Sequence, residues 1–458
     1  MSERVDYAHP DERYPPGFRA RRGLNWGAIG LLYASFYLCR YNFPLVNEAI
    51  SKEYGFSKTQ MGWIITVVSL AYAFGQIANG LLTDRIGGKR AMLIGAAGTI
   101  ILNVLFGVAS FWGWFGLFML IRGMDSYMQS FGAPGMIKMN AAWFHRKERG
   151  RFAGIFGFMI NIGRFSANWL VPAIIGGTVI LGVIHIPPQH WRWAFWVPAI
   201  ITTLVALVMA VAVKETPEAA GFHRSDPDER HDASEPDPKL TTVIRIITGN
   251  PAIWLCALAY ACTGAVRAGI DQWFPRYMSE VYNVDMKSAQ FQVLAWSIPI
   301  VATLGSLTSG YISDVFFAGR RAPVAAILYG VETLIILAAA QVSGVNATIA
   351  MFVLIAFTAN STHSIIGTAA AMDIGGRRMA GFASGCIDSF QYFGQALAGA
   401  ALGSIVEKHW DNYFYFMAPF GVIGMLLMIA LRWVPPPKPT APDAKPATPG
   451  AVQTPAEV

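Results

Sequence analysis

Runs of about twenty apolar residues recur along the chain from Asn25 almost to Trp433. A helix of about that length crosses the hydrocarbon core of a bilayer. In such a segment only a helix satisfies its own backbone hydrogen bonds without water. We count about twelve runs and therefore predict an all-α membrane protein with about twelve transmembrane helices. The runs lie near residues 25–47, 60–82, 91–110, 113–138, 152–176, 191–213, 251–275, 288–312, 322–342, 347–371, 380–405 and 411–433.

The composition excludes a soluble domain. Hydrophobic residues make up 54% of the 458 positions and charged residues only 14%, whereas a soluble domain carries about 25% charged residues. The net charge of +7 does not indicate a nucleic-acid partner, because basic residues concentrate in alternate short loops, such as 85–90, 146–151 and 320–321. This positive-inside pattern predicts a multi-pass protein of the inner cell membrane, surrounded by lipid, with both termini in the cytoplasm.

Two landmarks repeat along the chain at nearly the same spacing. Arg40 and Arg267 are 227 positions apart, and Asp84 and Asp314, each in a loop with glycine and arginine, are 230 apart. Independent landmarks with one offset predict a duplicated six-helix unit. The predicted organisation is a cytoplasmic tail (1–24), an N-terminal six-helix bundle (25–213), a polar cytoplasmic linker (214–250), a C-terminal six-helix bundle (251–433) and a disordered cytoplasmic tail (434–458).

Arg40 and Arg267 lie inside segments that are otherwise apolar enough to cross the membrane. A guanidinium stays charged, and a charge at the membrane centre costs about 3 kcal/mol or more. One such arginine in each half predicts a cavity that holds a small anion. The planar guanidinium fits phosphate, sulfonate and carboxylate alike. The alternative for Arg267 is an ion pair with Asp271, one turn on, whereas Arg40 has no acidic residue within one turn.

Several short segments resemble a known family. Residues 80–90, Gly-Leu-Leu-Thr-Asp-Arg-Ile-Gly-Gly-Lys-Arg, resemble the signature loop of the major facilitator superfamily, and residues 310–321 resemble it more weakly. Within that superfamily, residues 37–43 and 267–277 resemble the helix 1 and helix 7 patterns of the organophosphate:phosphate antiporters, which include glycerol-3-phosphate and hexose-phosphate transporters. Two further matches lie at 143–150 and 215–221.

The resemblance implies the major facilitator fold and assigns roles to particular residues. It makes Arg40 and Arg267 the pair that grips the substrate phosphate, with Tyr37 of the helix 1 pattern beside them. It places Asp84 at a cytoplasmic gate, where a carboxylate can lie against the positive end of a neighbouring helix. Two further residues share this expected gate or structural role: Arg85 and Asp314.

The chain departs from the family pattern at three positions of the expected pocket. Gln76 stands where the family has a lysine in helix 2, and Ile160 stands where it has a histidine before Asn-x-Gly in helix 5. Arg164 stands where the family has a glycine. One cation is thereby moved from helix 2 to helix 5. We expect Gln76 and Arg164 to contact the substrate, and we expect the anion to bind in a shifted position.

Other ionisable residues also lie inside the apolar runs. Arg122 and Asp125 are three positions apart on one helix face, and they either form an internal ion pair or line a gate. His363 and Asp388 are isolated titratable groups, which in a membrane are functional candidates by default. We take His363 as a candidate substrate contact, and Asp125 and Asp388 as candidates for proton coupling.

The sequence shows no catalytic motif, no phosphate-cradling loop and no metal-spaced set of histidines or cysteines. Thiols inside apolar helices behave as small hydrophobic groups. All the cysteines fall inside the apolar runs: Cys39, Cys256, Cys262 and Cys386. We therefore expect no enzyme activity, no cofactor and no metal, and we expect a monomer.

The sequence thus predicts a secondary transporter that moves a small organic anion by alternating access. An anion shared by Arg40 and Arg267 would draw the two bundles together, so that binding is coupled to their rocking. Exchange of an organophosphate for phosphate is the first expectation. One alternative is a proton-coupled symporter of a sulfonate or of a carboxylate such as a sugar acid. The other is a transporter-like membrane receptor for a phosphorylated metabolite, because the resembled family includes a hexose-phosphate sensor.

Overall fold

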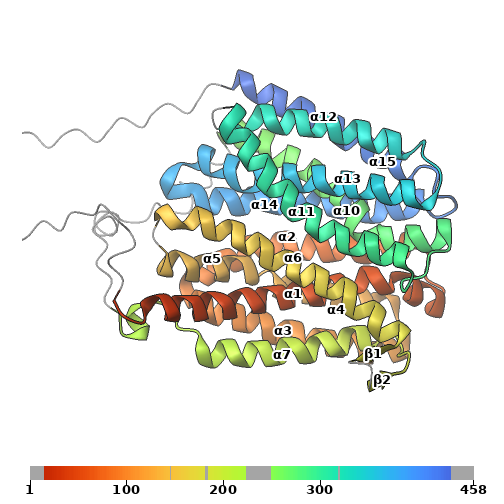
Figure 1. The fold of residues 1–458 in the computed structure, drawn as a ribbon, viewed down its shortest axis with the longest axis horizontal. Helices are drawn as coiled ribbons and strands as arrows, with labels where there is room; N and C mark the ends of the chain where they lie inside the picture. The colour runs from red at the N-terminus through yellow and green to blue at the C-terminus, as the bar shows by residue number, and fades with distance from the viewer. Residues whose placement is uncertain (1–14, 145, 181–183, 223–248, 318–319, 435–458) are drawn as a thin grey trace, which may run out of the picture.

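Long helices run side by side across the whole molecule in two groups (Figure 1). We refer to α1–α7 as the N half and to α10–α15 as the C half. This computed structural model describes residues 15–144, 146–180, 184–222, 249–317 and 320–434. For residues 146–156, 180, 184 and 368–386 it describes only the backbone.

The helices of the two halves have similar lengths and similar order. The N half contains α1 (Phe18–Tyr54), α2 (Lys58–Ile86), α3 (Gly88–Ala109), α4 (Phe115–Gln129), α5 (Gly132–Trp143), α6 (Arg146–Gly176) and α7 (Trp193–Ala212). The C half contains α10 (Pro251–Tyr282), α11 (Ala289–Phe316), α12 (Arg321–Ala339), α13 (Val345–Ser364), α14 (Ala371–Ile405) and α15 (Tyr413–Ala430). The short elements are η2 (Ser110–Trp112), η3 (Glu218–Ala220), the π-helical segment η4 (Ile365–Ala370), η5 (Leu431–Trp433), β1 (Thr178–Ile180) and β2 (Ile184–Ile186).

Polar residues at the helix ends explain where several helices begin and end. α2 begins after a capping box in which Ser57 and Gln60 exchange hydrogen bonds between side chain and backbone. Asn250 caps α10, and Pro251 occupies its first position, where no backbone N–H is needed. The first helix of each half ends on a left-handed residue, Gly55 after α1 and Asn283 after α10. The first helices of the two halves therefore end with the same local backbone conformation.

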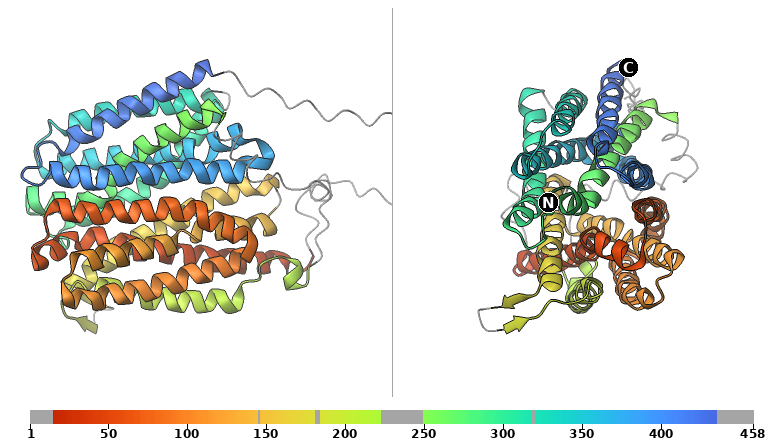
Figure 2. Two further views of the ribbon diagram at one scale, coloured as in Figure 1. Left: turned by 180° about the vertical axis from the view of Figure 1, so that it is seen from behind. Right: turned by 90° about the vertical axis from the view of Figure 1, so that its right-hand side faces the viewer.

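The packing of the helices has an approximate two-fold symmetry. In the N half, α1 packs against α6 and α7, α2 against α4, and α3 against α4 and α7. In the C half, α10 packs against α14 and α15, α11 against α13, and α12 against α13 and α15. The halves meet through α2 with α14 and, in the equivalent way, through α6 with α11, while α1 packs against α10. This arrangement is the one expected for a duplicated six-helix unit. Viewed end-on, the two bundles lie next to each other (Figure 2).

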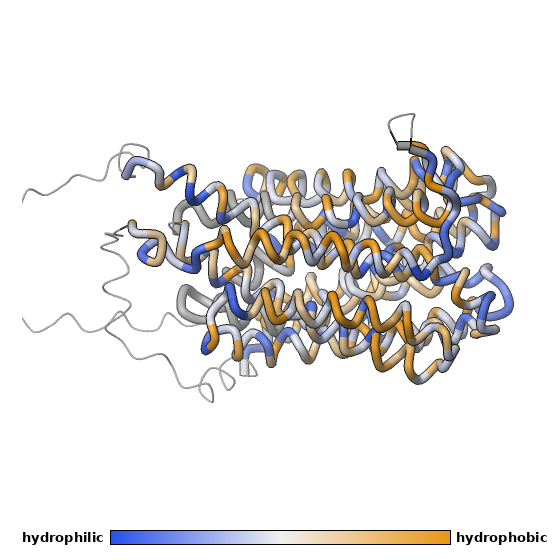
Figure 3. Tube along the Cα trace, turned by 90° about the horizontal axis from the view of Figure 1, so that it is seen from below, coloured by the Kyte–Doolittle hydropathy of each residue, from blue (hydrophilic) through white to orange (hydrophobic). Residues whose placement is uncertain are grey.

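Nine helical segments of the described residues are long and apolar enough to cross a membrane. Apolar residues line their length, and polar residues gather toward the ends of the molecule (Figure 3). α4, with 15 residues, is too short to be among the nine. α1 and α14 carry Arg40 and Asp388 among their apolar residues. The chain is therefore a multi-pass membrane protein whose most polar helices contribute residues to the site described below.

The structure differs from the sequence expectations at four places. The run 113–138 is split into α4 and α5, because Pro134 lacks a backbone N–H and disfavours a continuous helix. An antiparallel hairpin, β1 with β2, joins α6 to α7 and pairs Thr178 with Ile186. The loop expected after residue 371 is absent, since residues 345–405 are all helical. α1 also begins at Phe18, inside the segment predicted to be a tail.

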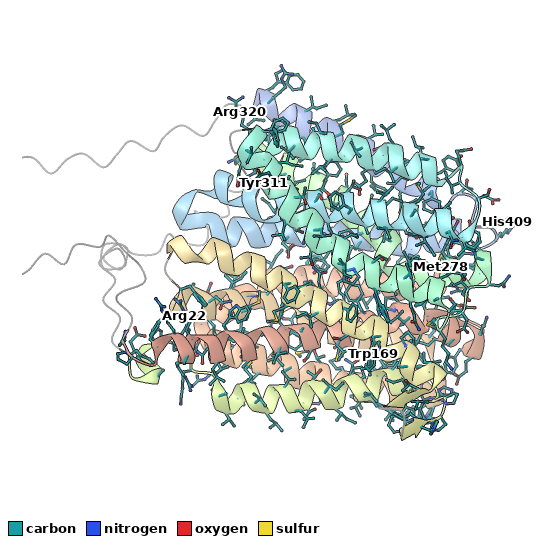
Figure 4. All side chains as sticks on the ribbon, in the orientation of Figure 1. Arg22, Trp169, Met278, Tyr311, Arg320 and His409 are labelled. Carbon is teal, nitrogen blue, oxygen red and sulfur yellow. The ribbon has the colours of Figure 1, made fainter. Side chains whose placement is uncertain are left out.

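The two ends of the molecule are distinguished by the positions of the hairpin and of three labelled residues. Figure 4 places Arg22 and Arg320 toward one end and His409 at the opposite end, where the hairpin also lies. We refer to the latter as the hairpin end. It contains the turns after α1 (55–57), α10 (283–288) and α14 (406–412). The linker core (223–248) and the outer parts of both predicted tails fall outside the described residues.

Candidate functional site

Arg40 on α1 lies in an aromatic and amide environment without an acidic partner among the contacts of the described residues. Its Nε donates to Gln129 Oε1 at 2.9 Å, and its Nη1 donates to the Tyr392 hydroxyl at 3.4 Å. Its guanidinium stacks over the rings of Tyr37 and Tyr72, at 4.8 Å and 4.3 Å from the centroids. Its Nη2 is buried without a hydrogen-bond partner. The positive charge is thus held in position, but no carboxylate contacts it directly among the described residues.

Gln129 connects Arg40 to the ion pair that the sequence suggested on α4. Arg122 Nη1 lies 2.8 Å from Asp125 Oδ2, and both side chains are buried. Gln129 Nε2 donates to Asp125 Oδ1 at 3.1 Å, so that Gln129 Oε1 is turned toward Arg40. The structure therefore shows Asp125 in an internal ion pair. Its candidate role in proton coupling stays a prediction.

Arg267 on α10 is the counterpart of Arg40 in the C half, and its surroundings are different. Its Nη1 donates to His363 Nδ1 at 3.0 Å, and its Nη2 lies 3.6 Å from Asp271 Oδ2. Because arginine has no acceptor, His363 Nδ1 must be an unprotonated acceptor in this contact. The Tyr260 hydroxyl lies 2.5 Å from the same nitrogen. Arg267 Nε is buried and unpartnered.

Arg164 on α6 crosses the boundary between the halves. Its Nη2 forms a short ion pair with Asp271 Oδ1, and both side chains are almost fully buried. The face of the Tyr41 ring lies 4.9 Å from its guanidinium, and the Tyr41 hydroxyl donates to Asp271 Oδ2 at 3.1 Å. Arg164 thus points into the interior between the halves. Its predicted contact with a substrate stays a prediction.

A second interhalf contact joins Gln76 of α2 to Asp388 of α14. Gln76 Nε2 donates to Asp388 Oδ2 in a short hydrogen bond, and the Tyr260 hydroxyl donates to Oδ1 at 3.3 Å. The Asp388 carboxylate interacts electrostatically with both Arg40 and Arg267. These contacts bring both predicted arginines and five other predicted residues into one site: Tyr37, Gln76, Arg164, His363 and Asp388.

A small cavity lies beside Arg40 on the side toward Arg122. Its volume is about 30 Å³, which is enough to hold water. Polar side chains from both halves line it together with apolar ones: Arg40, Ser69, Tyr72, Arg122, Ser126, Gln272, Tyr392 and Gln395. A cavity of this size admits water, but an organic anion would require the surrounding helices to move apart.

The three residues expected at the gate lie at the end opposite the hairpin end. The Asp84 side chain is 77% exposed and lies 3.9 Å from Lys138 Nζ. It does not contact a helix N-terminus among the described contacts; the backbone N–H of Gly88 at the start of α3 donates instead to Glu215. The gate role of Asp84 therefore stays a prediction. Arg85 is exposed, and Asp314 pairs with Arg321 of its own half at 3.0 Å. Their gate role stays a prediction.

The hairpin end is closed by contacts between the halves. Lys58 of α2 forms an ion pair with Glu280 of α10 at 2.7 Å. Glu407 accepts hydrogen bonds from the backbone N–H groups of Lys58 and Thr59, at 3.2 Å and 2.6 Å. Partial burial pushes the pKa of Glu407 upward. The hydrogen bonds from Thr59 and Lys58 outweigh that effect, and hold the pKa below its ordinary 4.5. A carboxylate that stays ionised therefore ties α14 to the start of α2.

Several residues of the site were missed by sequence reasoning. Four of them are polar but uncharged, so the charge pattern of the sequence does not reveal them: Gln129, Tyr260, Tyr392 and Tyr41. The three tyrosines are also hard to distinguish because the chain is rich in aromatic residues. Asp271 was considered only as a neighbour of Arg267 on the same helix. Its stronger contact is with Arg164, which lies 107 positions away in the sequence. Spacing along the chain could not reveal that contact.

Comparison with known proteins places this chain in a family. A family model described as the Major Facilitator Superfamily matches residues 29–399 of the chain. The chain belongs to the major facilitator superfamily. A crystal structure of a bacterial homolog of the human lysosomal transporter Spinster, inward-facing and unoccupied, superposes with a TM-score of 0.71 at 17% identity. The match covers 90% of this chain and 97% of that one. At that identity the likeness shows the fold alone.

Within the superfamily, curated relatives carry names that match the resemblance seen in the sequence. The membrane sensor protein UhpC of Salmonella typhimurium is 28% identical over 88% of this chain and 89% of its own length. The glycerol-3-phosphate transporter of Bacillus subtilis is 28% identical over 94% and 96%. A probable hexose phosphate transport protein of Chlamydia trachomatis is 25% identical over 87% and 88%. The resemblance to the organophosphate:phosphate antiporter family is thereby confirmed.

Proposed function

We propose that this major facilitator protein is a secondary transporter that exchanges a small organophosphate for phosphate across the inner cell membrane. The observation that carries the proposal is Arg40, a half-buried arginine whose Nη2 is buried and unpartnered, with no carboxylate partner among the described contacts. A buried charge is stable only when it is paired. A bound anion supplies that partner, and the unpartnered Nε of Arg267 offers it a second donor from the other half.

Three further observations support the organophosphate class. The relatives include proteins named as transporters of glycerol-3-phosphate and hexose phosphate. Arginine binds phosphate oxygens through two parallel N–H groups, which gives both strength and orientation. The hydroxyls of the tyrosines around Arg40 can donate to further oxygens of such a head group. The basic loops at the end opposite the hairpin end support a cytoplasmic location for that end, which would leave the closed hairpin end facing outward.

The test is exchange in proteoliposomes loaded with unlabelled phosphate and challenged with labelled phosphate. We expect uptake without a proton gradient, and we expect external organophosphates to compete better than sulfonates or sugar acids. Unloaded vesicles serve as the control, because an exchanger needs an anion on both sides. Uptake that requires a proton gradient, and that fails in Asp388→Asn, would replace the proposal with the proton-coupled symporter.

A membrane receptor for a phosphorylated metabolite is a second candidate. It is favoured by the 28% identity to a protein named as a membrane sensor. A receptor binds its anion through the same arginine pair but does not accumulate it. Binding of labelled glucose 6-phosphate by the purified protein, together with no counterflow in proteoliposomes, would decide for the receptor.

A further inference from the structure

Asp388 on α14 is a carboxylate of the site that forms no ion pair among the described residues. Its two hydrogen-bond partners, Gln76 of α2 and Tyr260 of α10, are both uncharged. The charges of Arg40 and Arg267 act on it electrostatically, but neither guanidinium forms a hydrogen bond with it in the described contacts. An ionised carboxylate has about four acceptor positions. The site therefore contains a negative group that can accept further donors.

Gln76 adds an unused acceptor beside this carboxylate. Its side chain is 7% exposed, and its Nε2 donates to Asp388 Oδ2. Its Oε1 is buried and has no hydrogen-bond partner in the part of the chain that the structure describes. A buried acceptor that stays unpaired is unfavourable. A donor brought to this point would therefore gain a hydrogen bond that the protein alone does not make.

The unpartnered donors of the site lie on its two arginines, close to these acceptors. Arg40 Nη2 and Arg267 Nε are buried without a partner among the described contacts. Arg267 is connected to Asp388 through His363 and Tyr260, in three successive contacts of 3.0 Å, 2.5 Å and 3.3 Å. One part of the site thus suits an anion, and an adjacent part suits a hydrogen-bond donor.

The charges of the site favour a positively charged donor over a neutral one. Three guanidinium groups, on Arg40, Arg164 and Arg267, accompany two carboxylates, on Asp271 and Asp388, so that one positive charge is in excess. A phosphate ester carries up to about two negative charges near neutral pH. An ester that also bears an ammonium group has a net charge close to that of the phosphate monoanion, and either one balances the excess. Uncompensated charge is unfavourable inside a membrane.

We propose that the organophosphate taken by this site is an aminoalkyl phosphate, with its phosphate on Arg40 and Arg267 and its ammonium group on Asp388 and Gln76. A primary ammonium has three N–H donors and no acceptor, which matches the Asp388 carboxylate and Gln76 Oε1. The hydroxyl groups of a sugar or glycerol phosphate can donate, but they do not compensate the carboxylate charge. The halves must move apart to admit the ligand, as for any organic anion. This inference rests on the proposed exchange function.

The first experiment compares phosphoethanolamine with hydroxyethyl phosphate, which has a hydroxyl group in place of the ammonium group. Both compete with labelled phosphate for uptake into phosphate-loaded proteoliposomes of the unsubstituted protein. We expect phosphoethanolamine to inhibit at a concentration about tenfold or more lower, because it adds a hydrogen bond between charged groups. Equal inhibition by the two ligands, or stronger inhibition by hydroxyethyl phosphate, would overturn the proposal. This comparison does not depend on the folding of a variant.

Two variants then test whether the preference comes from this carboxylate. Asp388→Asn removes the charge with little change of shape, and Gln76→Lys brings a cation of the protein to the point from which Nε2 now contacts Asp388. In both variants the ratio of the two inhibitory concentrations should fall toward one. The control is Asn168→Ala, which removes a neutral hydrogen bond of 2.6 Å to the Ala295 carbonyl between the same two halves and should keep the ratio. A preference that survives Asp388→Asn would overturn the assignment of the ammonium to Asp388.

Calorimetric titration of the purified protein with the same two ligands separates this inference from the proposed function. If phosphoethanolamine binds more tightly but the protein exchanges no phosphate, the exchange function fails and the ammonium site stands. If phosphate is exchanged and the two ligands bind equally, the ammonium site fails and the exchange function stands. The titration also gives the ratio of affinities for a variant that binds but does not transport.

Discussion

At the scale of single residues, the two arginines of the site use their planar donor groups in different ways. Arg40 donates from Nε to Gln129, and Arg267 donates from Nη1 to His363. Each guanidinium keeps one nitrogen without a hydrogen-bond partner. A guanidinium can do this because it presents five N–H donors in a fixed fork. A lysine carries its charge on one freely rotating group and cannot hold a neighbour and an anion in the same geometry.

We therefore expect Arg40→Lys and Arg267→Lys each to weaken phosphate exchange strongly while the protein remains folded. The loss of one hydrogen bond to a charged group, about 1.5–3 kcal/mol, corresponds to a roughly 10- to 100-fold weaker apparent affinity. Exchange in proteoliposomes measures it. The control is Arg432→Lys, whose guanidinium lies over the Trp433 ring at the end of the last helix. Full exchange in both site variants would place the anion elsewhere.

Asp125 provides a second prediction at the residue scale. Its carboxylate pairs with buried Arg122 and also accepts from Gln129, the residue that orients Arg40. Asp125→Asn would leave Arg122 as an unpaired buried charge. We expect the variant to lose about 3–5 kcal/mol of stability, seen as a lower melting temperature in detergent. A variant of unchanged melting temperature that loses only proton dependence would instead identify Asp125 as a proton carrier.

At the scale of helices, α2 and α14 approach each other closely because glycines face the contact. A Cβ added at Gly399 would lie 2.6 Å from Thr66 Oγ1 and 2.8 Å from the carbonyl oxygen of Gly62. Small residues of this kind let membrane helices pack backbone against backbone. The Thr66 hydroxyl donates to the Ala396 carbonyl at 2.6 Å, which strengthens the same contact.

We expect Gly399→Ala to force α2 and α14 apart and to cost about 1–3 kcal/mol, the usual range for overpacking. The melting temperature should respond, and so should the closure of the hairpin end. Closure is measured as the distance between spin labels at Lys52→Cys and His409→Cys, two positions that are exposed at that end. Gly27→Ala on α1 is the control, because a Cβ there meets no atom within 4 Å. Equal behaviour of the two variants would show that α2 and α14 are not in tight contact in the membrane.

At the scale of the whole molecule, closure of the hairpin end depends on ion pairs that respond to pH. The pKa of Glu407 is lowered from 4.5, because the donors on Lys58 and Thr59 outweigh its partial burial. A group with a lowered pKa in the closed form stabilises that form above its ordinary pKa. This stabilisation is lost as the pH falls through the lowered value.

We therefore expect closure to persist from neutral pH down to about 4.5 and to weaken only at lower pH. The distance between the labels at Lys52→Cys and His409→Cys, recorded against pH, measures it. In Glu407→Gln this acid-dependent opening should disappear, because the amide does not titrate. An opening that begins well above 4.5 would mean that another group controls closure.

The sequence by itself determined the fold class, and it predicted the division into two halves and the two arginines. Apolar runs of membrane length can only be helices, and a buried guanidinium must have an anionic or aqueous partner. Both conclusions follow from the chemistry of single segments. The helix break before Pro134 also had a local signal, but the hairpin and the helical stretch across residues 365–380 did not.

Only the tertiary structure decided which polar groups meet. Asp271 lies one turn from Arg267, but its short ion pair is with Arg164, in the other half of the molecule. Gln76 pairs with Asp388, a partner that the sequence did not indicate. Gln129 supports Arg40, although it does not stand out in the sequence. These contacts depend on the rotation of each helix about its axis and on the docking of the two halves. Both are set by packing among many side chains, which no local pattern encodes.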